Sequence, residues 1–356
     1  MAVSTISATG LASNVSQLGK NLIQNGAYNV AQRGASFAAH ADAYSLDRWL
    51  YSKDATTAAI TVTQATDVPA GEGFGTSIKI DVTTADSSIA AGDLARFTQR
   101  IEAQNLVQLK YGASGAKTMT LSFWIKSTKI GTFSIFAFSE DGSRWFNASY
   151  TVDVTNTWEY KTVTIAGDTG GTINNDTGIG LIVGWTLIAG SNSVATADTW
   201  AGNADYAASS YSMLDSTSNN ILITGVQLEV GTVATDFEHE PISVTLQKCR
   251  RYLRHLLSTT NTPLLTGYAG STTAAYFPVQ FDPPMRAAPT FSVSAVGDFT
   301  VDMVGAARDT TGIVIAKATT YAARLDVAVG SGLTAGQAVH LSFDATGKTM
   351  IFTAEL

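Results

Sequence analysis

Apolar and polar residues alternate along most of the chain from Asn21 to Val230, and this period of two constrains the fold more than any other feature. In the segment TMTLSFWIKS (118–127) one side is apolar and carries Met119, Leu121, Phe123 and Ile125. Successive side chains of a β-strand point to opposite faces of its sheet, so this pattern predicts a half-buried strand. The same period returns in NILITGVQLEV (220–230), the last strand before a change of pattern.

About eight or nine such strands occur before Val230, and no convincing helix separates them. The composition agrees, because only 14% of residues are charged and the chain contains 31 glycines. Short strands joined by turns of small residues are typical of β-sandwiches. The sequence therefore predicts an all-β protein with an antiparallel sandwich.

The pattern changes at Pro241, where PISVTLQKCRRYLRHLL (241–257) predicts an amphipathic helix with proline in its first turn. Apolar residues recur at spacings of four and three, and these are Ile242, Leu246, Cys249, Leu253 and Leu256. Two explanations stay open. The helix could lie on its own sandwich, or it could pack against copies of itself around an axis. Two heptads alone would be a marginal oligomer, so neighbouring domains would have to help.

Alternation returns after Thr262 and indicates a second, smaller β domain. We therefore expect an N-terminal arm at 1–20, a sandwich at 21–240, a connecting helix at 241–258 and a C-terminal β domain at 259–356.

Charge and hydropathy exclude several classes of partner. The net charge of −7 opposes nucleic-acid binding, which normally requires a basic face. No apolar run approaches the roughly 20 residues that a membrane helix needs, so no membrane insertion is expected. A single cysteine, Cys249, permits no intrachain disulfide and favours assembly in a reducing cytoplasm.

No motif in the sequence indicates catalysis. The four histidines occur in no recognised catalytic setting, G-x-S-x-G is absent, and no Cys/His cluster has metal-ligand spacing. Two facing carboxylates of a glycosidase need not be adjacent in the chain and stay open. We expect no enzyme activity, no cofactor and no metal.

Aromatic residues are the remaining candidates for a site. Trp124 falls on the polar side of its strand, opposite Phe123 and Ile125. Either a loop or another subunit covers this ring, or it binds sugar, because a flat ring covers the apolar face of a sugar at little entropic cost. Further candidates for carbohydrate binding are Trp145 after a turn, and Trp200, Tyr206 and Tyr211 in the long loop 191–219.

Several motifs together resemble a domain of tailed-bacteriophage virion proteins of the tail-fibre or receptor-binding type. They are NLIQNGAYNVAQRG, DRWL, TLSFWIKS, TWEYKTVTIAGDTGG and GVQLEVGTVATDFEH, followed by CRRYL, and the match runs from about Asn21 to Tyr252. The resemblance implies a jelly-roll of the galactose-binding or carbohydrate-binding-module type. Related modules often hold a structural calcium, but Thr224 and Gly225 supply no carboxylate where its ligands would be, which leaves Asn25 and Glu229.

The resemblance also implies what the chain assembles with. Members of this group are commonly homotrimers in the virion, so we expect a homotrimer that is assembled in the host cytoplasm with other virion proteins. A tail fibre or spike that contacts host surface polysaccharide without catalysis is the leading interpretation. The alternative is a capsid decoration or head-fibre protein, which the short N-terminal arm favours.

Overall fold

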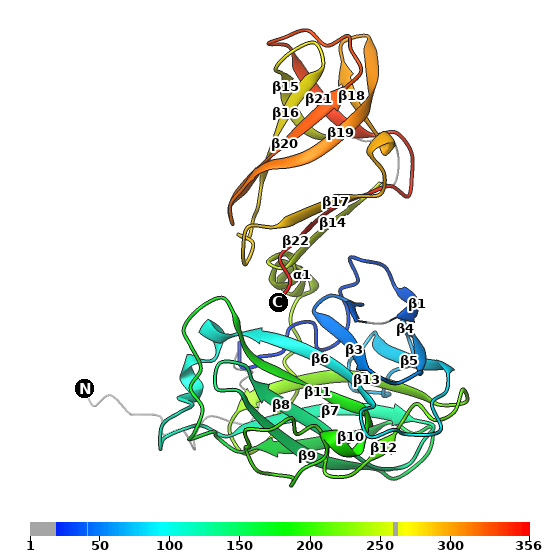
Figure 1. Ribbon diagram of the computed structural model, residues 1–356, viewed down its shortest axis with the longest axis vertical. Coiled ribbons are helices and arrows are strands. Elements are labelled where there is room, and N and C mark those ends of the chain that lie inside the picture. The colour runs from blue at the N-terminus through cyan, green and yellow to red at the C-terminus, as the bar shows by residue number, and fades with distance from the viewer. Residues whose placement is uncertain (1–18, 41, 259–262) are drawn as a thin grey trace, which may run out of the picture. The chain divides into compact units, whose positions relative to one another are not determined.

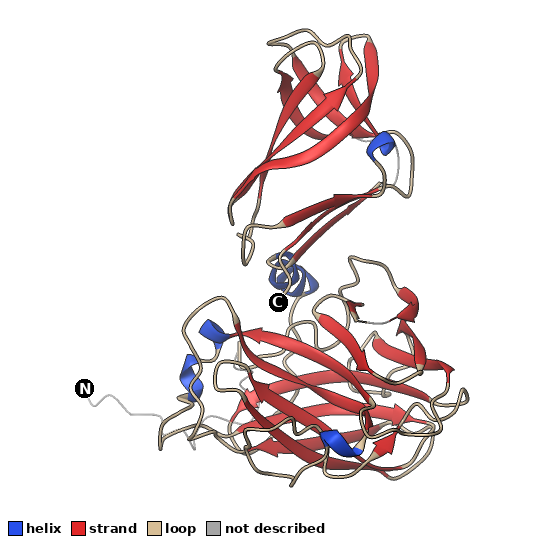
Figure 2. Ribbon diagram, in the orientation of Figure 1, coloured by secondary structure: helices blue, strands red, loops and turns tan. Residues whose placement is uncertain are grey.

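The computed structural model describes residues 19–40, 42–258 and 263–356 (Figure 1). They divide into two compact units. The sandwich unit contains the described residues up to Asn29 and Ala35–Pro241, and the barrel unit contains Val30–Gly34 and Ile242–Leu356. Strands make up almost all of the regular structure in both units (Figure 2). The prediction of an all-β protein with one connecting helix is therefore confirmed.

Two antiparallel sheets form the sandwich unit. Sheet A has the strand order β1 (Ser36–His40), β4 (Ala59–Ala65), β5 (Ser77–Thr84), β13 (Asn220–Val230), β7 (Met119–Ser127) and β10 (Glu159–Ile165). Sheet B has the order β2 (Ala43–Tyr44), β3 (Trp49–Asp54), β6 (Leu94–Glu102), β11 (Ile179–Ala189), β8 (Gly131–Ser139) and β9 (Arg144–Val152), and β12 (Tyr211–Ser212) pairs with β11. Short 3₁₀ turns are η2 (Ala103–Asn105), η3 (Val107–Leu109) and η4 (Ser191–Ser193).

Large aromatic side chains fill the space between the two sheets. Phe123 of β7 meets Trp185 of β11 edge-on, with ring centroids 5.1 Å apart. Trp49 of β3 stacks on Phe97 of β6 at 5.4 Å, and all four rings are buried. The predicted apolar side of β7 is thus the core side, and the predicted polar side of the same strand faces outward.

Residues 191–219, called here the cover segment, pack against the outer face of sheet B. Thr186 of β11 donates a hydrogen bond to the carbonyl of Tyr206 at 2.7 Å. Asn147, fully buried on β9, donates from its amide to the carboxylate of Asp205. The long loop is therefore a packed layer, and its aromatic residues are used to cover the sheet.

The barrel unit begins with α1 (Ile242–Arg250) and contains two sheets. A three-stranded sheet joins β14 (Leu253–Leu257), β22 (Thr349–Thr353) and β17 (Thr290–Val293). A closed barrel has the order β15 (Pro263–Ala269), β16 (Ala274–Gln280), β20 (Ala322–Val329), β19 (Ala306–Ala318), β18 (Phe299–Met303) and β21 (Ala338–Phe343), with η5 (Val296–Asp298) before β18.

The helix predicted for 241–258 is only half right. It ends at Arg250, and residues 253–257 form β14, which pairs with β22 in an antiparallel register. The segment LRHLL fits either structure by its local pattern, and pairing with a strand a hundred residues away decides in favour of the strand. Leu253 and Leu256 consequently do not continue the helical stripe of Ile242, Leu246 and Cys249.

Burial along this stripe is uneven. Ile242 is 55% exposed and Leu256 is 37% exposed, whereas Cys249 and Leu253 are buried. A continuous oligomerisation seam over 242–256 is therefore wrong, because its five members lie on two different elements and two of them are already buried. A homotrimer stays a prediction that does not depend on this stripe.

A short N-terminal segment completes the barrel unit. The guanidinium of Arg33 forms an ion pair with the carboxylate of Glu355 at 3.1 Å. The side-chain amide of Gln32 donates to the carbonyl of Leu253 at 3.1 Å. This pairing could not be predicted from the sequence, and residues 30–34 were assigned with the rest of 21–240 to the sandwich.

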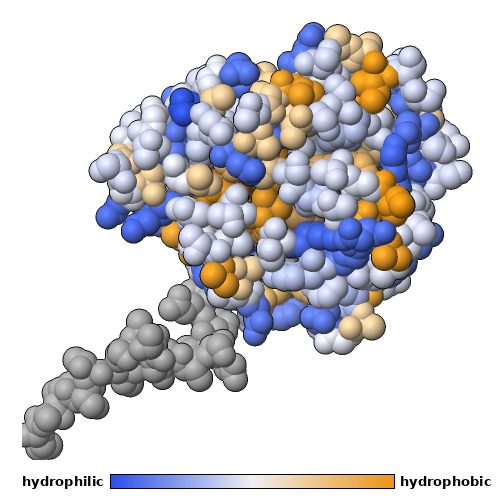
Figure 3. All heavy atoms as spheres, turned by 90° about the horizontal axis from the view of Figure 1, so that it is seen from below, coloured by the Kyte–Doolittle hydropathy of each residue, from blue (hydrophilic) through white to orange (hydrophobic). Residues whose placement is uncertain are grey.

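The surface is mixed in character. Figure 3 shows one face of the molecule, on which hydrophobic side chains lie in small groups between hydrophilic ones. Small apolar groups of this kind are usual on protein surfaces. No helix among the described residues is long and apolar enough to cross a membrane.

Candidate functional site

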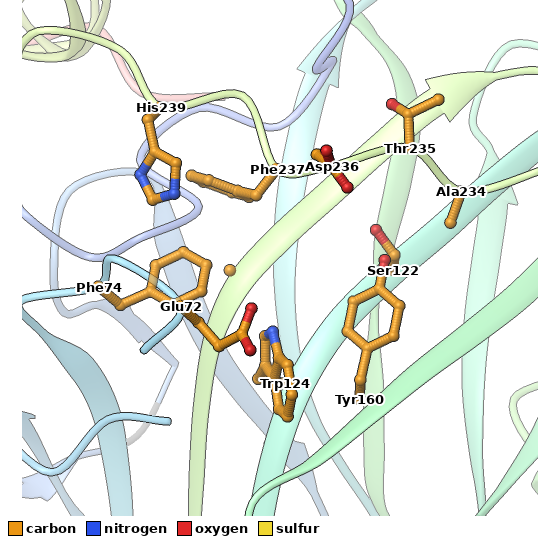
Figure 4. A pocket seen from close by; sticks show the side chains of 11 residues that line it. Glu72, Phe74, Ser122, Trp124, Tyr160, Ala234, Thr235, Asp236, Phe237 and His239 are labelled. Atoms are coloured by element: carbon orange, nitrogen blue, oxygen red, sulfur yellow. The ribbon is translucent and has the colours of Figure 1, made fainter. Parts of the chain in front are cut away.

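A cavity of about 440 Å³ opens on the outer face of sheet A, beside Trp124 (Figure 4). The sheet contributes side chains from β7, β10 and β13, and two loops close the sides. The lining residues are Glu72, Phe74, Ser122, Trp124, Tyr160, Gly225, Ala234, Thr235, Asp236, Phe237 and His239. The predicted orientation of Trp124 away from the core is therefore confirmed, and its ring lies in a cavity.

Trp124 and Tyr160 form the aromatic floor of the cavity. They lie opposite each other on the neighbouring antiparallel strands β7 and β10, with ring centroids 5.3 Å apart and planes tilted by 48°. Trp124 is half-buried and Tyr160 is 44% exposed, so both rings keep surface that a ligand can contact. Cross-strand aromatic pairs stabilise each other, and the two rings are thereby fixed in place.

Burial raises the pKa of Tyr160 above its ordinary value. A hydrogen bond with Ser122 opposes this increase, while the carboxylates of Glu229, Asp236 and Glu72 add to it. A nearby negative charge disfavours the phenolate, so the phenol stays protonated and can donate a hydrogen bond.

Three further rings form one side wall. Phe74 contacts Phe237 with centroids 5.0 Å apart and His239 at 5.2 Å, and Phe237 contacts His239 at 5.0 Å. Phe74 lies in the loop between β4 and β5, whereas Phe237 and His239 follow β13 (Figure 4). Two loops that are far apart in the sequence are thus joined by aromatic packing.

A β-bulge at Gly225 makes room for this wall. The pairing of β13 with β7 shifts register between Thr224 and Gln227, and Gly225 has φ +61°. A Cβ at this position would lie 2.5 Å from the ring of Phe74. Glycine is required here because it adopts positive φ without strain and lets the ring approach the backbone. Thr224 fixes the same loop by donating to the carbonyl of Thr76 at 2.8 Å.

Two buried side chains of β13 hold the segment that forms the other wall. The carboxylate of Glu229 accepts hydrogen bonds from the backbone N–H and the hydroxyl of Thr235, both at 2.8 Å. The amide oxygen of Gln227 accepts from the N–H of Glu238 at 2.8 Å. The segment 231–240, which we call the strap, is therefore fixed to the sheet by two side chains that are two residues apart and lie on the same face of β13.

Of the two residues considered as calcium ligands, Glu229 uses its carboxylate oxygens elsewhere, and Asn25 is held through its amide nitrogen. Glu229 holds the strap, and the side-chain amide of Asn25 donates to the carbonyl of Asp47 at 3.1 Å. Within the described residues, no group of three or more His, Cys, Asp or Glu side chains gathers in a way that could hold a metal ion.

Two of the predicted aromatic ligand residues belong to the cover segment and are buried between it and sheet B. Trp200 is 9% exposed, donates from its indole to the carbonyl of Ala166 at 2.6 Å, and packs on Phe146. Tyr206 is also 9% exposed and packs against Phe136 at 4.9 Å. The expectation that these rings are exposed is wrong, because the segment that carries them folds back onto sheet B.

Tyr211 and Trp145 are half-buried and lie near the same cover segment. The hydroxyl of Tyr211 donates to the carbonyl of Thr186 at 2.7 Å, and burial raises its pKa well above the ordinary range. Trp145 stacks on Phe138 at 4.1 Å. Neither lines the cavity beside Trp124. A role of these two residues in ligand binding stays a prediction.

Most of the cavity was not visible in the sequence. Tyr160 could have been found, since it alternates with core residues in β10 as Trp124 does in β7. Glu72, Phe74, Asp236, Phe237 and His239 lie in irregular segments, and local periodicity carries no information on where such segments fold.

No protein-family model matches this chain, and no curated protein matches it. Among solved structures it is similar to the enzymatically active domain of tailspike protein 4 from bacteriophage CBA120. The two share 19% sequence identity, and the TM-score is 0.35. The match covers 60% of this chain and 22% of that chain. A putative sugar binding protein from Bacteroides thetaiotaomicron is 11% identical, with a TM-score of 0.35 over 59% of this chain and 100% of that chain.

A family 11 carbohydrate-binding module of a cellulosomal cellulase from Clostridium thermocellum is 12% identical, with a TM-score of 0.28 over 56% of this chain and 95% of that chain. Because these identities and TM-scores are low, we derive the function from the cavity itself.

Proposed function

We propose that this chain is a non-catalytic, glycan-binding structural protein of a tailed-bacteriophage virion, and that the cavity beside Trp124 is its sugar site. The observation that carries the glycan site is the Trp124–Tyr160 floor, which keeps exposed aromatic surface beside hydroxyl and carboxylate groups. Sugars present apolar C–H faces and polar edges, and this combination matches both.

Both the floor and the walls of the cavity are held in place by regular structure and buried side chains, as expected of a binding site rather than a packing defect. Both rings are held by a regular strand pair, and the walls are held by the buried Gln227 and Glu229. A pre-formed site avoids the cost of ordering loops on binding. A single site of this kind binds weakly, so the homotrimer expected from the resemblance would increase the overall affinity through avidity.

Binding of the purified chain to immobilised glycans tests the site. We expect Trp124→Ala and Tyr160→Ala to abolish binding while they leave the unfolding temperature nearly unchanged, because both rings are only partly buried. Tyr321→Ala is the control, since Tyr321 is 66% exposed in the barrel unit. Unchanged glycan binding in both cavity variants, or equal loss in the control, would refute the assignment.

The virion role rests on the motifs quoted above. Immunogold labelling of intact particles separates its two forms, since a tail fibre or spike is labelled at the tail and a decoration or head-fibre protein is labelled on the capsid. Absence of label from purified particles would refute both.

A further inference from the structure

The cavity beside Trp124 carries two carboxylates that are not neutralised. Glu72 and Asp236 both line it, and Figure 4 shows them on the same cavity as the aromatic rings. Within the described part of the chain, neither carboxylate group has an ion pair, and neither accepts a hydrogen bond. Both side chains are exposed and can be reached by a ligand in the cavity.

Lys20 contacts the strap but does not pair with either carboxylate. The ammonium of Lys20 donates to the carbonyl oxygen of Asp236 at 2.6 Å and to the hydroxyl of Thr235, and thus binds the outside of the strap. Two more carboxylates are buried nearby, that of Glu229 on β13 and that of Glu238 in the strap, and these residues are 5% and 3% exposed. The cavity is therefore a region of negative potential, in agreement with the raised pKa of Tyr160.

Such a cavity discriminates between ligands by charge. A uronic or sialic acid would bring a third negative charge beside Glu72 and Asp236 and would be repelled. A neutral sugar would have to desolvate both carboxylates and would return only hydroxyl hydrogen bonds. An ammonium group would pair with the carboxylates and could lie over the face of Trp124 or Tyr160, where cation–π attraction adds to the binding.

We propose that the cavity selects a sugar that carries a free ammonium group, such as a glucosamine unit with an unacetylated amine, over its N-acetylated, neutral or acidic counterpart. This inference rests on the proposed glycan site and names the chemical class of its ligand. Glu72 and Asp236 are the specificity residues, and Trp124 and Tyr160 supply the surface that any sugar contacts.

Two tetrasaccharides that differ in one group test the proposal by calorimetric titration. Tetrameric glucosamine and tetrameric N-acetylglucosamine share a backbone, and only the first carries ammonium groups when the solution is mildly acidic. We expect the glucosamine tetramer to bind about tenfold more tightly at low salt. Added salt should reduce this preference, because exposed charges are screened.

Substitutions assign the preference to its residues. Glu72→Gln and Asp236→Asn should each reduce the ratio of the two affinities while binding of the N-acetylated tetramer is retained. Glu140→Gln is the matched control, since Glu140 is an exposed residue that does not line the cavity and its substitution changes the net charge equally. Tryptophan fluorescence during heating checks that each variant is folded.

The outcomes separate this proposal from the one on which it rests. Equal affinities for the two tetramers, or a preference that survives in both cavity variants, would overturn selection for an ammonium group and leave the glycan site intact. A preference that Glu140→Gln reduces equally would show a general charge effect and would also overturn it. The glycan site itself would be overturned if the chain binds neither tetramer and if Trp124→Ala reduces its binding to no immobilised glycan.

Discussion

The buried pair of Asp205 and Asn147 makes the stability of the sandwich unit depend on pH in an unusual direction. Both residues are fully buried, and the amide nitrogen of Asn147 donates to Oδ1 of Asp205. Within the described residues, Oδ2 of Asp205 and Oδ1 of Asn147 have no hydrogen-bond partner. Burial raises the pKa of Asp205 from 3.8 to about 6, and the hydrogen bond from Asn147 only partly opposes this.

The sign follows from proton linkage. The folded state holds the proton of Asp205 up to about pH 6, whereas the unfolded chain releases it near 3.8. Between these values the folded state binds more protons, so its stability rises as the pH falls. The raised pKa of Asp205 destabilises the folded state by about 3 kcal/mol at pH 7.5 and by roughly half of that at pH 5. The unfolding free energy should therefore increase by roughly 1–2 kcal/mol when the pH is lowered from 7.5 to 5.

Denaturant unfolding followed by tryptophan fluorescence measures this change in the correct unit, because the six tryptophans all lie in the sandwich unit. Asp205→Asn removes the ionisable group, and its new amide supplies a donor for the unpaired oxygen of Asn147. We expect this variant to lose the increase at pH 5 and to be more stable than the native chain at pH 7.5. Histidine titration affects both proteins equally and cancels in the difference. The reasoning is refuted if the native chain and the variant change in parallel.

Three further substitutions test the packing described above. Gly225→Ala should destabilise the sandwich unit by about 1–2 kcal/mol and weaken glycan binding, because residue 225 has a positive φ and its new Cβ would lie 2.5 Å from the ring of Phe74. Gly75→Ala should do neither, since its Cβ would meet open space. Equal glycan binding by the two variants would contradict the role of the bulge. Trp200→Ala should lower the unfolding free energy by roughly 3–5 kcal/mol as a core truncation, and a value near zero in denaturant titration would show that the ring is not structural. Leu253→Asp should strongly lower the unfolding temperature of the barrel unit in calorimetry, because Leu253 is buried. Leu257→Asp on the same strand should hardly change that temperature, because Leu257 is 57% exposed. Similar shifts in the two variants would contradict the burial of Leu253.

The sequence predicted the parts of this fold that depend on neighbouring residues. The alternation in β7 places Phe123 in the core and Trp124 outside it, because strand geometry alone determines that difference. The burial of Trp200 could not be predicted in this way, since it depends on the return of the cover segment to sheet B. The end of α1 at Arg250 depends likewise on pairing with β22, which begins about a hundred residues later.

The cavity depends on distant residues in a more specific way, and strand β13 explains how. Its core-facing residues complete sheet A, while its outward residues build the site: Gly225 admits Phe74, and Gln227 and Glu229 fix the strap that carries Asp236 and Phe237. Glu229 was considered from the sequence only as a calcium ligand, although its carboxylate accepts two hydrogen bonds from Thr235 instead. This buried carboxylate needs no metal ion, because the hydrogen-bond donors of Thr235 already compensate its charge. The same strand that closes the sandwich therefore also positions the walls of its cavity, which couples the folding of this sheet to the shape of the site.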